Sequence, residues 1–185
     1  MLEDLYLETE DLMNKTLAHL KHELSGLRTG RASTGIFENI KVDYYGTPTP
    51  LNQIANISIP DARMVVIQPW EKKMLNVIEK AILTSDLGLN PNNDGQLIRV
   101  PIPYMTEERR KDMVKLISKM TEEARIAVRN IRRDANEKIK KAEKASELSK
   151  DNAADGLEAI QEMTNSHIKK LDLLFELKEK EILES

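Results

Sequence analysis

The stretch from Thr106 to Ala145, TEERRKDMVKLISKMTEEARIAVRNIRRDANEKIKKAEKA, decides the fold. Between Met113 and Ala135 its apolar residues recur three, four or seven positions apart, as they do along one face of an α-helix. Thr106 is a suitable N-cap, and Glu107 and Glu108 follow it where the helix dipole favours acidic side chains. The pattern predicts a single helix of about 60 Å, because each helical residue adds about 1.5 Å.

Segments at both ends of the chain carry the same kind of apolar stripe. The first runs from about Leu2 to Arg28, and the last runs to Leu183 after a break at residues 149–155. A stripe with a period near 3.5 residues needs a partner to bury it, so we expect both segments to pack with the long helix as a three-helix bundle. The stripe residues are Met13, Leu17, Leu20, Leu24 and Leu27 in the first segment and Leu157, Ile160, Thr164, His167, Leu171 and Leu174 in the last.

Between residues 36 and 103 the pattern changes to short β-branched runs that turn residues interrupt. Alternating polar and apolar positions predict strands, and clusters of turn residues predict the loops between them. Apolar spacings of three and four predict one short helix. A small α+β unit follows, with strands at 40–44, 54–59, 64–67 and 97–102, a helix at 73–84, and turns at 46–50, 60–61 and 90–95.

The predicted fold class is therefore α+β. Residues 1–30 and 105–185 would form the long three-helix bundle, and residues 31–104 would be a small domain inserted into it. Two chain crossings, the first linker at about 30–34 and the second linker at about 101–106, have little bulk and suggest a hinge. Three helices of one chain can bury one another's stripes, so we expect a monomer. A protein that oligomerises through its helices is the alternative.

The composition excludes several classes of protein. The chain has no cysteine, so disulfides, thiolate metal sites and cysteine nucleophiles are ruled out, and a reducing compartment fits. Aromatic residues make up 4%, which argues against a large aromatic-lined ligand pocket. No segment approaches the roughly 20 apolar residues of a membrane span, and the acidic start is not a signal peptide. We expect a cytoplasmic protein with no membrane partner.

The strongest functional clue is a basic segment within the long helix. Seven basic and two acidic residues lie between positions 125 and 141, although the chain has a formal net charge of −3. On a helical wheel Arg125, Arg129, Arg132 and Arg133 fall about 80° to 180° from the apolar stripe, all on one side. Acidic residues four positions away are largely missing, so we expect these arginines to bind phosphates of a folded RNA by its shape. An acidic protein partner or a solvated helix face are the alternatives.

Signals for catalysis are missing. Neither a GxxxxGK[ST] phosphate loop nor a GxGxxG motif is present, so we expect no nucleotide hydrolysis, no cofactor and no enzyme. His19 and His22 are three positions apart but have no evident third ligand, so no metal site is predicted. An RNA-acting enzyme is the alternative, without a nucleophile, metal cluster or acid–base pair to support it. His167 is expected at a buried or boundary position, and Trp70 is expected to pack in the small domain or to anchor a partner.

Five motifs occur in order along nearly the whole chain. They are Leu27–Ser33 (LRTGRAS), Tyr44–Pro48 (YYGTP), Ser85–Pro91 (SDLGLNP), Thr106–Lys111 (TEERRK) and Val128–Asn136 (VRNIRRDAN). Together they resemble the signatures of the ribosome recycling factor family. Several long motifs in one order make the resemblance highly specific.

The resemblance implies an L-shaped molecule of roughly transfer-RNA dimensions, in which a β/α/β domain is joined to the bundle by a flexible elbow. It also implies a translation factor that binds the large ribosomal subunit after termination and, with elongation factor G and GTP, splits the post-termination complex. Its bundle would meet ribosomal RNA. The RNA-facing residues would be Arg28, Arg31, Arg110, Arg129, Arg132 and Arg133, to which the basic segment adds Arg125. The hinge residues would be Gly30, Ala32, Ser33, Pro103, Tyr104 and Met105.

Overall fold

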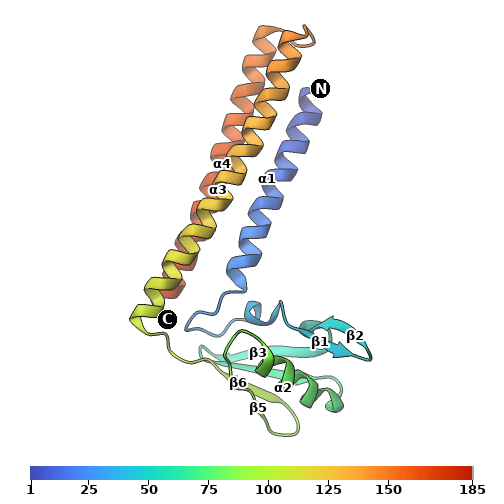
Figure 1. Cartoon of the computed structure of the whole chain (residues 1–185), viewed down its shortest axis with the longest axis vertical. Coiled ribbons are helices and arrows are strands. Elements are labelled where there is room, and N and C mark those ends of the chain that lie inside the picture. The colour runs from blue at the N-terminus through green and yellow to red at the C-terminus, as the bar shows by residue number, and fades with distance from the viewer. Residues whose placement is uncertain (185) are drawn as a thin grey trace. The chain divides into compact units, whose positions relative to one another are not determined.

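Three long helices, α1 (Leu2–Ser25), α3 (Glu107–Lys144) and α4 (Lys150–Glu184), hold more than half of the chain. The computed structural model describes residues 1–184 (Figure 1). It divides into two units, a helical unit of residues 1–24 and 112–180 and a sheet unit of residues 25–111 with the residues from 181 on. In the helical unit α3 and α4 run side by side (Figure 1).

The core of the helical unit is built from the predicted apolar stripes. One cluster joins all three helices, because Leu5 of α1 packs with Ala135 and Ile139 of α3 and with Ala153 and Ile160 of α4. Three threonines are also buried, and each donates its hydroxyl to the carbonyl four residues earlier at 2.7 Å, which removes the cost of an unpaired polar group. These threonines are Thr9, Thr121 and Thr164.

The helix ends correct two sequence expectations. Thr106 is the N-cap of α3 as predicted, since its Oγ1 accepts the Arg109 N–H at 3.1 Å. However, α1 ends at Ser25 and not at Arg28, one residue before Gly26. Glycine loses more conformational freedom in a helix than other residues do, so it favours such an end.

The break between α3 and α4 lies at residues 145–149 and not at 149–155. Ser146 takes a left-handed φ of 61°, and the Glu147 N–H returns to the Ala142 carbonyl at 2.9 Å. Ser149 Oγ then accepts the Asn152 N–H at 3.1 Å and caps α4. Polar residues such as Asp151 are common in turns, but they are also favoured in the first turn of a helix, and here they begin α4.

The sheet unit contains two antiparallel sheets. Strand β1 (Lys41–Tyr44) pairs with β2 (Thr47–Pro50), and a second sheet has the strand order β3-β4-β6-β5. Its strands are β3 (Ala55–Asp61), β4 (Met64–Pro69), β5 (Asn92–Asn93) and β6 (Ile98–Pro101). The remaining elements are α2 (Leu75–Thr84) and three short 3₁₀ helices, η1 (Thr34–Phe37), η2 (Leu51–Gln53) and η3 (Lys72–Met74).

The turn predictions in this unit were partly wrong. Residues 47–50, expected within a turn, form β2, and the actual turn is Tyr45–Gly46, where both residues have positive φ. The two prolines of β2 are tolerated because β2 has a partner on one side only. The second turn is Ala62–Arg63 and not 60–61, because β3 continues through a register shift to Asp61. The loop at 90–95 contains β5.

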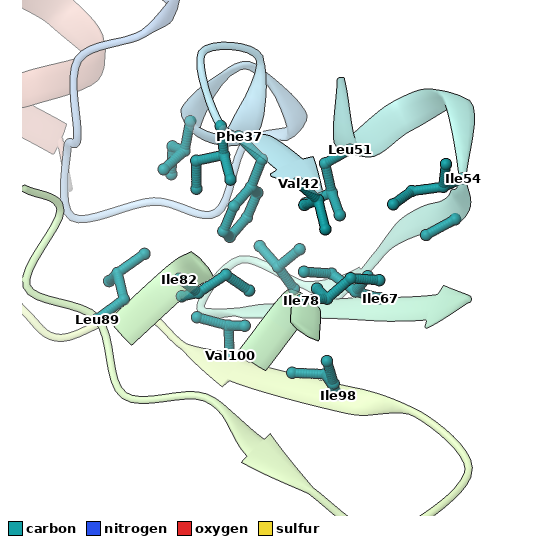
Figure 2. Close-up of a cluster of buried hydrophobic side chains, with 14 of the residues drawn as sticks. Phe37, Val42, Leu51, Ile54, Ile67, Ile78, Ile82, Leu89, Ile98 and Val100 are labelled. Carbon is teal, nitrogen blue, oxygen red and sulfur yellow. The ribbon is translucent and has the colours of Figure 1, made fainter. Parts of the chain in front are cut away.

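One apolar core lies beneath α2. Ile78 and Ile82 of α2 are fully buried, and Figure 2 shows them beside Ile67, Ile98 and Val100 of the larger sheet. The same cluster takes in residues of η1, β1 and η2, so these three short elements are packed on this core. These residues are Ile36, Phe37, Val42 and Leu51. Within residues 1–184, no helix is long and apolar enough to cross a membrane.

Candidate nucleic-acid interface

Helix α3 carries exposed cations over several turns. Arg129 and Arg133 are both exposed, and so are Lys140 and Lys141. Arg129 lies 3.5 Å from Glu122, a weak contact at the surface. Among residues 1–184, Arg133 has neither an ion-pair nor a hydrogen-bond partner for its side chain. All of the guanidinium donors of Arg133 are therefore unengaged within the described residues.

Arg132 is half-buried and leans toward α4. Its Nη1 donates to Gln161 Oε1 at 3.2 Å, and Gln161 Nε2 donates to Asn165 Oδ1 at 2.8 Å. This surface network holds the guanidinium in place but uses only one of its five N–H groups. Arg132 can still present the remaining donors to a phosphate.

Arg125 is placed differently: no acidic residue lies four positions from it, as predicted, but Glu122 three positions earlier and Asp172 of α4 are its partners. Its side chain is 22% exposed, and its Nε and Nη2 both donate to Asp172 Oδ1, at 2.8 and 2.6 Å. Nη1 donates to Glu122 Oε2 at 3.0 Å. Burial alone would lower the pKa of Arg125, but the hydrogen bonds to Asp172 and then Glu122 outweigh it and raise the pKa. Arg125 thus joins α3 to α4.

The other three predicted arginines lie in the sheet unit, whereas these four belong to the helical unit. Arg28 is half-buried, and its Nη1 donates to the Leu87 carbonyl at 3.1 Å. Arg31 has an exposed side chain, while its backbone N–H donates to Thr29 Oγ1 at 3.3 Å. Arg110 is half-buried in the first turn of α3. Each unit therefore brings its own arginines, four in the helical unit and three in the sheet unit.

The six predicted hinge residues differ in their surroundings. The Gly30 carbonyl accepts a hydrogen bond from the Arg63 side chain, the Ala32 N–H donates to the Ala62 carbonyl, and Met105 is buried. Ser33 caps η1, since its Oγ accepts the Gly35 N–H at 3.2 Å. Pro103 and Tyr104 are exposed.

Arg63 is the residue that sequence analysis missed. Its guanidinium donates to the Gly30 carbonyl at 2.7 Å and lies 3.2 Å from the centre of the Tyr104 ring. An isolated arginine in a turn carries no signal that it will meet two segments about 30 to 40 residues away in either direction.

The histidines and the tryptophan complete the candidates. His19 lies 2.7 Å from Glu23, and no group of three metal-ligating side chains occurs in the described part of the chain. His167 is buried as expected, between the Met163 carbonyl and Asn14 Oδ1, each at 2.8 Å. The expectation that Trp70 packs in the small domain was wrong, because its side chain is 70% exposed. It stands at the end of β4, where the chain leaves the sheet for η3.

Comparison with known proteins identifies the family. The sequence model described as "Ribosome recycling factor" matches residues 20–183. The ribosome-recycling factor of Syntrophomonas wolfei is 54% identical over 184 residues, covering 100% of both chains, and that of Desulfatibacillum aliphaticivorans is 53% identical over 184 residues with the same coverage.

Solved structures agree with the sequence relatives. The solution structure of a ribosome recycling factor has a TM-score of 0.82 and 45% identity, covering 100% of this chain and 98% of that one. A second match, with a TM-score of 0.73, 49% identity and 99% of each chain covered, is the T. thermophilus ribosome recycling factor described with E. coli elongation factor G bound to the E. coli post-termination complex. A family match over most of the chain, relatives above half identity and a shared fold lead to one conclusion: the chain belongs to the ribosome recycling factor family.

Proposed function

We propose that this chain is a monomeric, cytoplasmic translation factor that binds the large ribosomal subunit after termination and, with elongation factor G and GTP, splits the post-termination complex. Membership of the family supports this, as does the T. thermophilus relative described together with elongation factor G on a post-termination complex. In this proposal the chain is not an enzyme, and the nucleotide is used by its partner.

The observation that carries the proposal is the run of exposed cations on α3. Arg129 and Arg133 stand four residues apart on one helix, so their Cα atoms lie about 6 Å apart along the axis and their side chains leave it on the same side. Planar guanidinium groups match the geometry of phosphate oxygens, and such contacts position a protein on RNA without reading its sequence. The face therefore suits a folded RNA with a fixed backbone path, such as ribosomal RNA.

The individual arginines have different roles in this proposal. Arg129, Arg132 and Arg133 contact ribosomal RNA directly. Arg31 offers an exposed cation from the sheet unit. Arg28 and Arg110 are half-buried and would add contacts at the chain crossings. Arg125 contributes by holding α4 against α3, since its donors already engage Asp172 and Glu122.

The two units would have different mechanical roles. The helical unit is stiff, because α3 and α4 are 38 and 35 residues long and are packed together with α1. We propose that elongation factor G pushes on the sheet unit and that the first and second linkers flex as a hinge while the helical unit transmits the force to contacts between the subunits. The energy comes from the partner, so the chain needs shape and rigidity but no catalytic group.

Co-sedimentation with isolated large subunits at several salt concentrations tests the RNA contact. The double variant Arg129→Ala/Arg133→Ala removes two exposed cations without touching the core. If each arginine neutralises one phosphate, the slope of log affinity against log salt should fall by about 1.5 to 2. Lys170→Ala on α4 is the matched control, because Lys170 is an exposed cation outside the basic segment.

The outcomes separate the interpretations. A smaller salt slope for the double variant, with the control like wild type and unchanged helicity by circular dichroism, supports RNA contact through α3. Equal slopes for all three proteins would show that this face is only solvated. The proposed function would then have to rest on the arginines of the sheet unit.

A further inference from the structure

The turn between β3 and β4 touches both linkers of the sheet unit. This turn, Ala62–Arg63, is itself held firmly: Asp61 Oδ1 accepts the Arg63 N–H at 2.8 Å, and the strands on either side are paired. A side-chain carboxylate that accepts a backbone N–H two residues later fixes a tight turn. The turn is therefore a rigid platform at one edge of the unit.

The first linker is bound to this platform at two points. The Ala32 N–H donates to the Ala62 carbonyl at 2.7 Å, and Arg63 Nη1 donates to the Gly30 carbonyl at 2.7 Å. Both distances are typical of strong hydrogen bonds. Gly30 and Ala32, both in the first linker, are thus tied to one turn.

The second linker meets the same turn. The Ile102 N–H donates to the Arg63 carbonyl at 2.8 Å, and the Arg63 guanidinium carbon lies 3.2 Å from the centre of the Tyr104 ring. Tyr104 is 74% exposed, and the Arg63 guanidinium lies over its ring. A cation over an aromatic face within about 6 Å is an attractive contact.

We propose that Arg63 is a clasp that couples the two linkers, so that loosening one of them loosens the other. The chemistry of arginine suits this task. Its N–H groups lie in the guanidinium plane and reach Gly30, while the flat face of the same group covers Tyr104. A lysine ammonium has no flat face and could not make both contacts in this way. The clasp deepens the proposed hinge, because linkers that open together let the units move about a single pivot.

The coupling is a property of the isolated chain and is tested without ribosomes. Amide hydrogen exchange, followed by NMR, reports the Ala32 and Ile102 N–H groups separately. Tyr104→Leu removes the aromatic face from the second linker. We expect exchange at Ala32, on the first linker, to become about two- to fivefold faster, the size expected for loss of an exposed cation–π contact.

Three variants sharpen the test. Tyr104→Phe keeps the aromatic ring, so the exchange rate of the Ala32 amide should stay as in the wild type. Arg63→Lys keeps the charge and should speed exchange at Ala32 as Tyr104→Leu does. Tyr45→Leu is the matched control, because Tyr45 is also an exposed tyrosine with a cation, Lys73 Nζ, 4.4 Å from its ring centre. This control should change the exchange rate of neither the Ala32 nor the Ile102 amide.

Two results would overturn the clasp. If Tyr104→Leu speeds exchange at Ile102 but leaves Ala32 unchanged, the linkers open independently. If Tyr104→Phe loosens Ala32 as much as Tyr104→Leu does, the stacked ring is not the coupling element. Protected core amides such as those of Ile67 and Ile78 must stay unchanged in each variant, which shows that the unit remains folded. Neither result depends on ribosome binding, so a failure of the clasp is distinct from a failure of the proposed function.

Discussion

Removing the link between Arg125 and Asp172 should weaken the helical unit by a measurable amount. The two side chains share hydrogen bonds of 2.8 and 2.6 Å, and Arg125 is mostly shielded from water. Fully exposed pairs couple by about 0.2 to 1 kcal/mol, and hydrogen bonds to charged groups contribute about 1.5 to 3 kcal/mol. The side chain of Asp172 is itself 45% exposed, so the coupling of this pair should be closer to the range for exposed pairs. We expect a coupling free energy of about 1 kcal/mol.

A double-mutant cycle measures this coupling directly. Arg125→Ala, Asp172→Ala and the double variant are unfolded in urea at 25 °C and followed by circular dichroism, which the long helices dominate. Urea is used because guanidinium chloride would screen the charges. The cycle cancels the contact of Arg125 with Glu122, which is present in both backgrounds. A coupling of this size should shift the melting temperature by about 2 to 4 °C and should shrink at 1 M salt.

The result also tests the structural role proposed for Arg125. A coupling below about 0.3 kcal/mol lies within the error of additivity and would refute the structural role. Arg125 would then be as free as Arg133 to bind RNA. If the coupling is as expected, Arg125→Ala should reduce large-subunit binding less than Arg133→Ala does when equal amounts of folded protein are compared.

Three further predictions concern the fold and its pH dependence. The N–H groups of Leu97 and Gln96 and then the Arg99 side chain lower the pKa of Asp94 from 3.8 to about 2. The contribution of Asp94 to stability is therefore present above about pH 4 and lost as the pH falls through about 2, and an NMR titration that found its pKa near 3.8 would contradict this. Gly35→Ala would place a Cβ 2.6 Å from the Ser25 carbonyl oxygen and should lower the free energy of unfolding in urea by about 1 to 3 kcal/mol. Gly156→Ala is the control and should lower it less, because the nearest contact of its Cβ is the flexible end of the Leu2 side chain at 3.0 Å. Ile139→Ala should lower the free energy of unfolding by about 2 to 5 kcal/mol because Ile139 is fully buried, and a loss as small as that of the exposed control Ile126→Ala would show that the helical core is not packed as described.

Elements with strong local signals were predicted well. The stripe of α3 and its cap at Thr106 lie within one segment, so periodicity and capping chemistry were enough to find them. The same holds for α2 and for the strands β3 and β4, whose boundaries differ from the expected ones by a few residues. The turn at 145–149 was misplaced because asparagine and aspartate favour both turns and helix starts.

Elements that depend on a distant partner were not predicted. Thr47–Pro50 contains two prolines and reads locally as a turn, yet it becomes a strand because β1 lies beside it. Trp70 was expected inside the small domain, but its core is filled by aliphatic side chains and Phe37, which leaves the indole outside. Hydrophobicity alone does not say which apolar residue a finite core will exclude.

For the candidate interface, the sequence by itself determined that cations gather on one side of α3, because helical geometry follows from residue spacing alone. It also carried the motifs that mark the family. Only the tertiary structure decided which cations are already engaged: Asp172, 47 residues from Arg125 along the chain, accepts its hydrogen bonds from α4, while the donors of Arg133 are unengaged within the described residues. The contacts of Arg63 were likewise decided by the tertiary structure, because Gly30 and Tyr104 are distant from it in the sequence. Charge and periodicity are local properties of a chain, but the partner of each polar group is chosen by packing between segments that the sequence holds far apart.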